Sequence, residues 1–204
     1  GEAAFPVLCA TRGGYRRMSR FLTNRHLDGN TDVTGDGDLV ALTGDRDGPV
    51  CQPLLRGDRK AALHAAEKLI ESFGRRNVFV ELTRHGLRDD RRLNRELMDL
   101  AEHLKLPPLA SNAPLFATRG DRRPGDAFTC LRHHLPLDQA GRLLEPNGER
   151  HLKSPREMAA LFSDVPEAVA NTARLAERVG FTLENLDYRF PDYHDGHGNP
   201  LSLA

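Results

Sequence analysis

The chain has 204 residues, a length that suits one ordinary domain or one domain with an appendage. Lys and Arg together number 29, as do Asp and Glu, so the formal net charge is zero. A dedicated nucleic-acid-binding domain usually has a basic excess, because phosphate neutralisation supplies most of its affinity. Any contact with DNA must therefore be local or made by other parts of a larger protein. The sequence has neither an apolar run near 18 residues nor a charged-then-apolar leader, which disfavours membrane spanning and secretion and indicates a cytoplasmic protein.

Strand-like and helical segments alternate through the first half of the chain, the pattern of an α/β domain. Short apolar runs predict strands, and apolar residues at helical spacing predict helices between them. The predicted strands are Pro6–Ala10, Leu39–Thr43, Val78–Leu82 and Leu109–Ser111, and the predicted helices are Gly14–Leu27, Arg59–Phe73 and Asp89–Lys105. This alternation predicts that neighbouring strands run parallel, joined by crossover connections.

The character of the sequence changes after Asn112, where a polar and turn-rich stretch follows and no further strand is evident. Ser154, followed by Pro155 and by a glutamate at the third helical position, has the pattern of a capping box, and Asp164 begins a similar pattern. We therefore expect two capped helices, Ser154–Phe162 and Val165–Val179. The predicted organisation is an α/β part over residues 1–120, a helical part over 121–190 and a loose tail over 191–204.

The histidines and cysteines do not form a recognisable metal or nucleophile motif. His133 and His134 are adjacent, so on a helix they point about 100° apart, which favours a pair near a helix end over a metal-binding pair. His194 and His197 lie in the predicted tail, which lacks rigid support for a metal site. The cysteines, Cys9, Cys51 and Cys130, are odd in number and lack CxxC spacing, so reduced thiols are expected. No residue is predicted to be catalytic.

Glu81 is the one acidic residue placed like a site residue. It lies near the carboxyl end of the predicted strand Val78–Leu82, with Arg84 and His85 just beyond. In parallel α/β sheets, sites are built at the carboxyl ends of the strands. The alternative is a strand-end carboxylate paired with a nearby arginine, and the residues alone favour this alternative.

Several segments, taken in order, resemble one family of enzymes. They are Leu8–Tyr15 (LCATRGGY), Phe79–Gly86 (FVELTRHG), Ala110–Asn112 (ASN), Thr129–Met158 (TCLRHHLPLDQAGRLLEPNGERHLKSPREM), Asn171–Thr172 and Tyr188–Asp192. Together they resemble bacterial C-family DNA polymerases, in particular the error-prone branch, from late in the PHP (polymerase and histidinol phosphatase) domain into the region that follows. The resemblance covers about residues 5–192. Because Gly1 is not a Met and a strand begins almost at once, we expect residues upstream to be missing.

The resemblance implies a partial, distorted PHP-type βα barrel followed by an all-helical segment. In the family this barrel can bind a cluster of divalent metal ions (Mn, Zn or Mg), and some members use it for proofreading or phosphoesterase chemistry. The family's His-x-His motif would lie upstream of Gly1, and the positions of an expected aspartate and histidine are Ala113 and Leu115 here. Only Glu81 stands at a matching ligand position, and one carboxylate cannot hold a metal cluster. No cofactor is therefore expected, and the missing first strands would leave sheet edges unpaired.

The family's polymerase active site would lie downstream of the residues present. The leading hypothesis is a non-catalytic fragment of an error-prone DNA polymerase, a nucleotidyltransferase (transferase) of DNA replication and of translesion synthesis and repair after DNA damage. Its role would be to scaffold the polymerase module, with DNA and accessory repair proteins as partners and no membrane. The alternative is a stand-alone PHP-like metal-dependent phosphoesterase or 3′–5′ exonuclease, so whether this chain is itself an enzyme stays open. A third hypothesis is a protein-interaction module that works through exposed helices.

Overall fold

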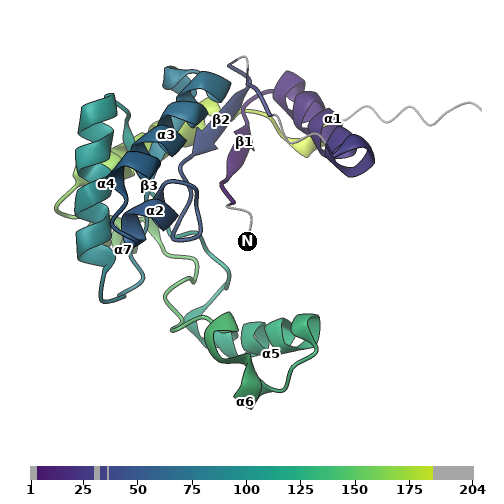
Figure 1. The fold of residues 1–204 in the computed structure, drawn as a ribbon, viewed down its shortest axis with the longest axis vertical. Coiled ribbons are helices and arrows are strands. Elements are labelled where there is room, and N and C mark those ends of the chain that lie inside the picture. Colours follow the sequence, from purple (N-terminus) through teal and green to yellow (C-terminus); the bar gives the residue numbers. More distant parts are fainter. Residues whose placement is uncertain (1–3, 30–32, 36, 186–204) are drawn as a thin grey trace, which may run out of the picture.

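The structure, a computed structural model, describes residues 4–29, 33–35 and 37–185, and within them it has a four-stranded sheet surrounded by helices (Figure 1). The strands are β1 (Val7–Cys9), β2 (Leu39–Leu42), β3 (Val78–Leu82) and β4 (Pro108–Ala110), and they lie side by side in that order. The α-helices are α1 (Arg12–Asp28), α2 (Cys51–Leu55), α3 (Arg59–Phe73), α4 (Asp90–Leu104), α5 (Arg122–His133), α6 (Leu137–Ala140), α7 (Pro155–Leu161) and α8 (Pro166–Arg178). The predicted mixed α/β class is confirmed.

The prediction that all neighbouring strands run parallel is wrong for the first pair. β2, β3 and β4 are parallel, but β1 is antiparallel to β2. The chain leaves the sheet after β1 and returns at Asp38, beside the point it left: the Ala10 amide donates to the Asp38 carbonyl at 2.8 Å, and the Thr11 hydroxyl donates to the Asp38 carboxylate at 2.9 Å. Both strands therefore meet at one end of the sheet, with α1 as an excursion between them.

Gly14 makes this close return possible. A Cβ atom at this position would lie 2.2 Å from the Asp38 carbonyl oxygen, so any other residue would force the two segments apart. The Thr11 side chain caps α1 by accepting a hydrogen bond from the Gly14 amide at 3.1 Å.

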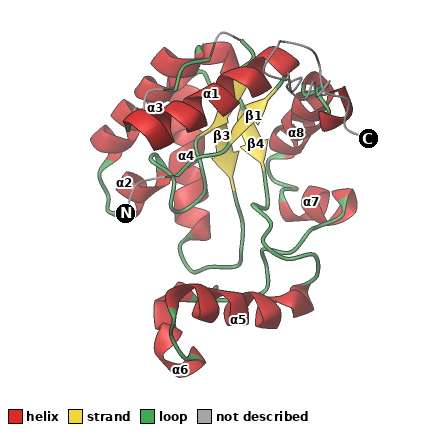
Figure 2. Ribbon diagram, turned by 90° about the vertical axis from the view of Figure 1, so that its right-hand side faces the viewer, coloured by secondary structure: helices red, strands yellow, loops and turns green. Residues whose placement is uncertain are grey.

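The two faces of the sheet bury different sets of side chains, as the alternation of a strand requires. The larger core lies between the sheet and α2, α3 and α4, and it includes Ala41, Val80, Leu82, Phe73 and Leu97. On the opposite face, Val40, Leu42 and Leu109 pack against Leu175 of α8. Figure 2 shows the strands between these helices.

Helix α8 covers the outer edge of β4. The Asn171 side-chain amide donates to the Pro108 carbonyl at 2.8 Å, and the Thr172 hydroxyl donates to the Ala110 carbonyl at 2.7 Å. These carbonyls belong to an edge strand and would otherwise be available to a further strand. Two side chains of α8 thus take the place of strand pairing.

The capping prediction is confirmed for α7 and wrong for α8. The Ser154 hydroxyl accepts from the Glu157 amide, and the Glu157 carboxylate accepts from the Ser154 amide, which completes the capping box. Asp164 does not cap α8, whose N-cap residue is Val165. Its carboxylate instead accepts two hydrogen bonds from Arg84, at 2.6 and 2.9 Å, because an arginine fork binds both carboxylate oxygens at once.

Helices α5 and α6 form a hairpin that stands apart from the sheet and its helices, on the side to which the carboxyl ends of β3 and β4 point (Figures 1 and 2). We call residues 119–144 the α5–α6 hairpin. No residue of α5 is buried. The predicted loose tail, with His194 and His197, and the Tyr188–Asp192 segment lie outside the described residues. In the part of the chain that is described, no helix has both the length and the apolar character needed to cross a membrane.

The hydrogen bonds from α8 to β4 make a testable prediction. Asn171→Ala would leave the buried Pro108 carbonyl without its side-chain donor, so we expect it to lower the free energy of unfolding by about 1–3 kcal/mol. Asn24→Ala, an exposed position on α1, is the matched control, because it makes the same change in a helix without touching the sheet. Chemical denaturation of both variants measures the difference. Equal stabilities would contradict the edge-covering role of α8.

Candidate functional site

Glu81 is buried at the carboxyl end of β3, as its place in the predicted strand suggests. Only 2% of the residue is exposed. Its backbone amide donates to the hydroxyl of Thr43, which follows β2, at 2.9 Å. Strand alternation directs its side chain to the face opposite Val80 and Leu82, where it lines a cavity of about 200 Å³ together with Asp45, Ala113 and Arg150. We call this cavity the Glu81 pocket.

Burial raises the pKa of the Glu81 carboxyl above its ordinary value. Hydrogen bonds from the Ser111 side chain and the Gly44 backbone, and the positive charge of Arg150, act in the opposite direction, while the charge of Asp45 adds to the rise. The Oε2 atom is buried and has no hydrogen-bond partner. Burial acts against the charged form of the carboxyl because the water that would solvate it is excluded.

Arg150 supplies the positive charge of the pocket. Its guanidinium forms an ion pair with Asp45 at 2.9 Å and another with Glu145 at 3.3 Å, and its Nε donates to the Ala113 carbonyl at 3.0 Å. The side chains of Arg150 and Asp45 are both only 18% exposed. Arg84 binds Asp164, and the arginine that lines the pocket with Glu81 comes from far along the chain.

The residues around Glu81 do not fit a metal cluster. Ala113 lines the pocket but offers no side-chain ligand, and Leu115 is 56% exposed. Among residues 4–29, 33–35 and 37–185, no three His, Cys, Asp or Glu side chains are grouped so that they could hold an ion. Glu81 therefore lies at the strand end, as predicted, without the partners that a metal cluster needs.

Cys51, on α2 beside the pocket, is a buried thiol. Burial, together with the negative charges of Asp45 and Glu81, raises its pKa to about 12. Its sulfur lies 3.5 Å from the Gly44 carbonyl oxygen. A thiol with so high a pKa is neither a good nucleophile nor a ready metal ligand, because both roles need the thiolate. All three cysteines are free, as predicted.

Arg150 belongs to a segment that returns from the α5–α6 hairpin to the sheet. We call residues 149–153 the return segment; in sequence they are ERHLK. The amides of Leu115 and Phe116 donate to the Arg150 carbonyl, and the Leu152 amide donates to the Phe116 carbonyl at 2.9 Å. The outgoing and returning chains of the hairpin are thus joined where they meet the sheet.

Two buried polar side chains fix the return segment to the end of the sheet. The Asn112 amide group donates to the carbonyls of Glu149 at 2.9 Å and His151 at 2.5 Å. The Asn112 carbonyl lies 3.0 Å from Nε2 of His85, whose pKa is lowered mainly by burial. The Asn147 amide group in turn donates to the His85 carbonyl at 2.7 Å. The sequence reasoning singled out this run of residues but did not foresee these contacts.

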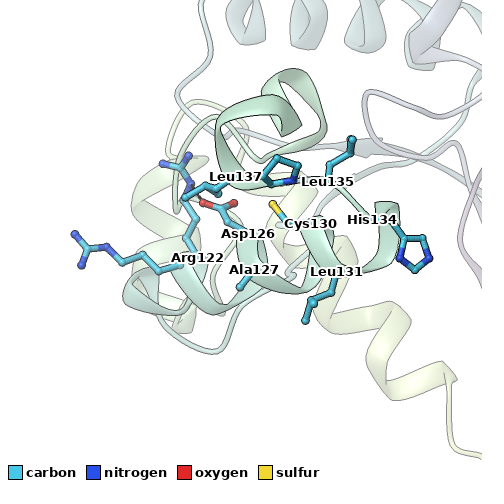
Figure 3. Close-up of a pocket in the computed structure, with 10 residues that line it drawn as sticks. Arg122, Asp126, Ala127, Cys130, Leu131, His134, Leu135 and Leu137 are labelled. Carbon is cyan, nitrogen blue, oxygen red and sulfur yellow. Dashed lines mark ion pairs between the residues drawn. The ribbon is translucent and has the colours of Figure 1, made fainter.

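The α5–α6 hairpin carries several exposed apolar side chains. A groove of about 840 Å³ lies along it, lined by Cys130, Leu131, Leu135 and Leu137 among others, with Arg122 at its edge (Figure 3). Leu131 is 69% exposed and Leu137 is 62% exposed. Phe128, on the same helix, is 72% exposed. Apolar side chains gathered in this way are typical of a surface that contacts another protein or another part of the same protein.

The histidine pair lies at the end of α5, as predicted. His133 is the last residue of the helix, and His134 is its C-cap in the left-handed conformation, with a φ of 53°.

The helix α5 starts close to the base of the hairpin. Gly125 allows this, because a Cβ atom there would lie 2.5 Å from the Phe116 ring.

Comparison with known proteins confirms the resemblance to error-prone DNA polymerases. The chain is 38% identical to the error-prone DNA polymerase of Mycolicibacterium paratuberculosis, 37% to that of Mycobacterium tuberculosis and 34% to that of Nocardia farcinica, in each case over 94% of its own length. It spans only 18–19% of the length of these relatives. No protein-family profile matches the chain.

The burial of Glu81 predicts how stability depends on pH. A carboxyl whose pKa is raised by folding stabilises the fold below its ordinary pKa, and this contribution is lost as the pH rises through the folded-state pKa. We therefore expect Glu81→Gln, which cannot ionise, to unfold at a higher temperature than the wild type at pH 8, with the difference disappearing near pH 4. Thermal melts across this range measure it. Glu102→Gln, an exposed change on α4, is the control, and a Glu81→Gln variant less stable than the wild type at pH 8 would contradict the expectation.

Proposed function

We propose that this chain is a non-catalytic part of an error-prone DNA polymerase, folded as a partial, distorted PHP-type βα barrel, that scaffolds the polymerase module. The whole protein would be a cytoplasmic nucleotidyltransferase that copies damaged DNA during translesion synthesis and repair. Its partners would be DNA and accessory repair proteins. The resemblance along 94% of the chain supports the placement in a polymerase.

The observation that carries the scaffolding role is the apolar surface of the α5–α6 hairpin. Phe128, Leu131 and Leu137 are exposed on an element that stands apart from the rest of the fold. Exposed apolar area of this kind is costly in water and is usually covered in the assembled protein. Since the relatives are about five times longer than the matched segment, their remaining domains are the natural cover.

The chemistry of the Glu81 pocket supports a non-catalytic role. Burial raises the pKa of Cys51 to about 12, and a cysteine nucleophile needs a thiolate. His85 is only 4% exposed, whereas a general base needs an accessible imidazole or carboxylate. These buried groups suit packing and hydrogen bonding.

The alternative function, a metal-dependent phosphoesterase or 3′–5′ exonuclease, has a direct test. In PHP enzymes the divalent ions would supply an activated water. We expect the purified chain, incubated with Mn²⁺, to release no more nucleotide from 3′-labelled DNA than a heat-denatured sample does. Hydrolysis that is lost in a Glu81→Gln variant would favour the enzyme over the scaffold.

The scaffolding role predicts an effect on polymerase activity. In the Mycolicibacterium paratuberculosis polymerase, the aligned segment is exchanged for this chain, and primer extension is measured. We expect the chimera to extend primers, and a Phe128→Ser, Leu131→Ser double variant to be about tenfold slower or worse, because the hairpin would lose its apolar contact.

Leu27→Ser is the matched control for this experiment, because Leu27 is 77% exposed on α1, away from the hairpin. The isolated chain should melt at the same temperature with and without the hairpin substitutions, since the side chains are exposed. A double variant as active as the unsubstituted chimera, or a chimera that does not extend primers, would contradict the proposal.

A further inference from the structure

The Glu81 pocket contains two acidic side chains and one fixed cation. Asp45, Glu81 and Arg150 line the same cavity of about 200 Å³. The Asp45 side chain is 18% exposed and Glu81 is 2% exposed, so both carboxyl groups are largely removed from water. Buried carboxylates need a neighbouring positive charge, because the water that would solvate them is excluded.

Arg150 is held in place from several directions. Asp45 and Glu145 accept from its two terminal nitrogens, at 2.9 and 3.3 Å, and the Ala113 carbonyl accepts from Nε at 3.0 Å. The return segment that carries Arg150 is itself tied down by Asn112. The guanidinium is therefore held in the pocket by two carboxylates and a carbonyl.

A divalent ion and this guanidinium would compete for the same carboxylates. Two positive groups about 4 Å apart repel each other by several kcal/mol at the effective dielectric of a protein surface. The Ser111 side chain, which donates to Glu81, offers a further oxygen of the kind that hard cations such as Mn²⁺ accept as a ligand. The residues that border the pocket are thus compatible with a cation, and Arg150 is the cation present.

We propose that Arg150 takes the place of a metal ion in the Glu81 pocket and thereby excludes divalent cations from Asp45 and Glu81. The inference goes beyond the scaffolding role, since it depends on the pocket alone. It implies that the charge at position 150, and not the loss of ligands alone, decides whether this pocket holds a metal. Removal of the guanidinium would convert the Asp45–Glu81 pair into a cation site.

The test is a titration of the full chain with Mn²⁺, with free Mn²⁺ followed by electron paramagnetic resonance. We expect Arg150→Met to bind about one Mn²⁺ per chain, at least about tenfold more tightly than the wild type does, a difference of about 1.4 kcal/mol. Adding Glu81→Gln or Asp45→Asn to Arg150→Met should abolish this gain. Arg142→Met, an exposed change on the hairpin, is the matched control and should bind as the wild type does.

The proposal is overturned if Arg150→Met binds Mn²⁺ no more tightly than the wild type does. It is also overturned if the wild type binds Mn²⁺ tightly and Glu81→Gln abolishes this binding. If Arg150→Met does not fold in buffer, circular dichroism is repeated with added Mn²⁺. If Mn²⁺ restores the fold of Arg150→Met but not that of Arg150→Met with Glu81→Gln, the result supports the proposal. If Mn²⁺ does not restore the fold of Arg150→Met, the result overturns it. None of these measurements involves polymerase activity, so this inference and the scaffolding role can fail separately.

Discussion

The ion pair between Arg150 and Asp45 is the interaction on which the rest of the site depends. It joins the return segment to the loop that follows β2, and so it connects the α5–α6 hairpin to the sheet. The same guanidinium holds the Ala113 carbonyl and lies beside Glu81. The position of the hairpin and the electrostatics of the pocket therefore have a common origin.

A largely buried ion pair is not in itself a source of stability, because removing two charges from water costs about as much as their attraction returns. The ion pair instead fixes the position of the return segment. A hydrophobic contact in place of Arg150 and Asp45 would tolerate a shift of the return segment, whereas the geometry of a guanidinium and a carboxylate does not. Asn112 adds a second directional constraint through its two hydrogen bonds to backbone carbonyls. Together they fix the exit angle of a hairpin that has few apolar contacts with the body.

The sequence predicts those elements whose formation depends on local pattern. The bounds predicted for β3 and α3 agree with the structure, because each has a clear apolar periodicity and a clear end. The bounds of α5 within the predicted helical part do not follow from the sequence, because none of its residues is buried and Pro124-Gly125 resembles a turn. The sequence predicts the strand β1 but not its antiparallel direction, because this direction follows from the contact of Ala10 and Thr11 with Asp38. Arg150 was missed for the same reason, since its partners are distant in sequence and only the fold brings them together.

The last feature of the pocket is the pKa of the ionisable groups in and beside it. Burial penalises the charged form of an ionisable group. Here the pKa of Glu81 and of Cys51 is raised and that of His85 is lowered, and burial is the main cause in all three. Arg150 and Asp45, which both line the pocket, are paired with each other, and Arg150 is also held by Glu145 and the Ala113 carbonyl. The pocket thus brings together the end of β3, the loop that follows β2 and the return segment that leads from the hairpin.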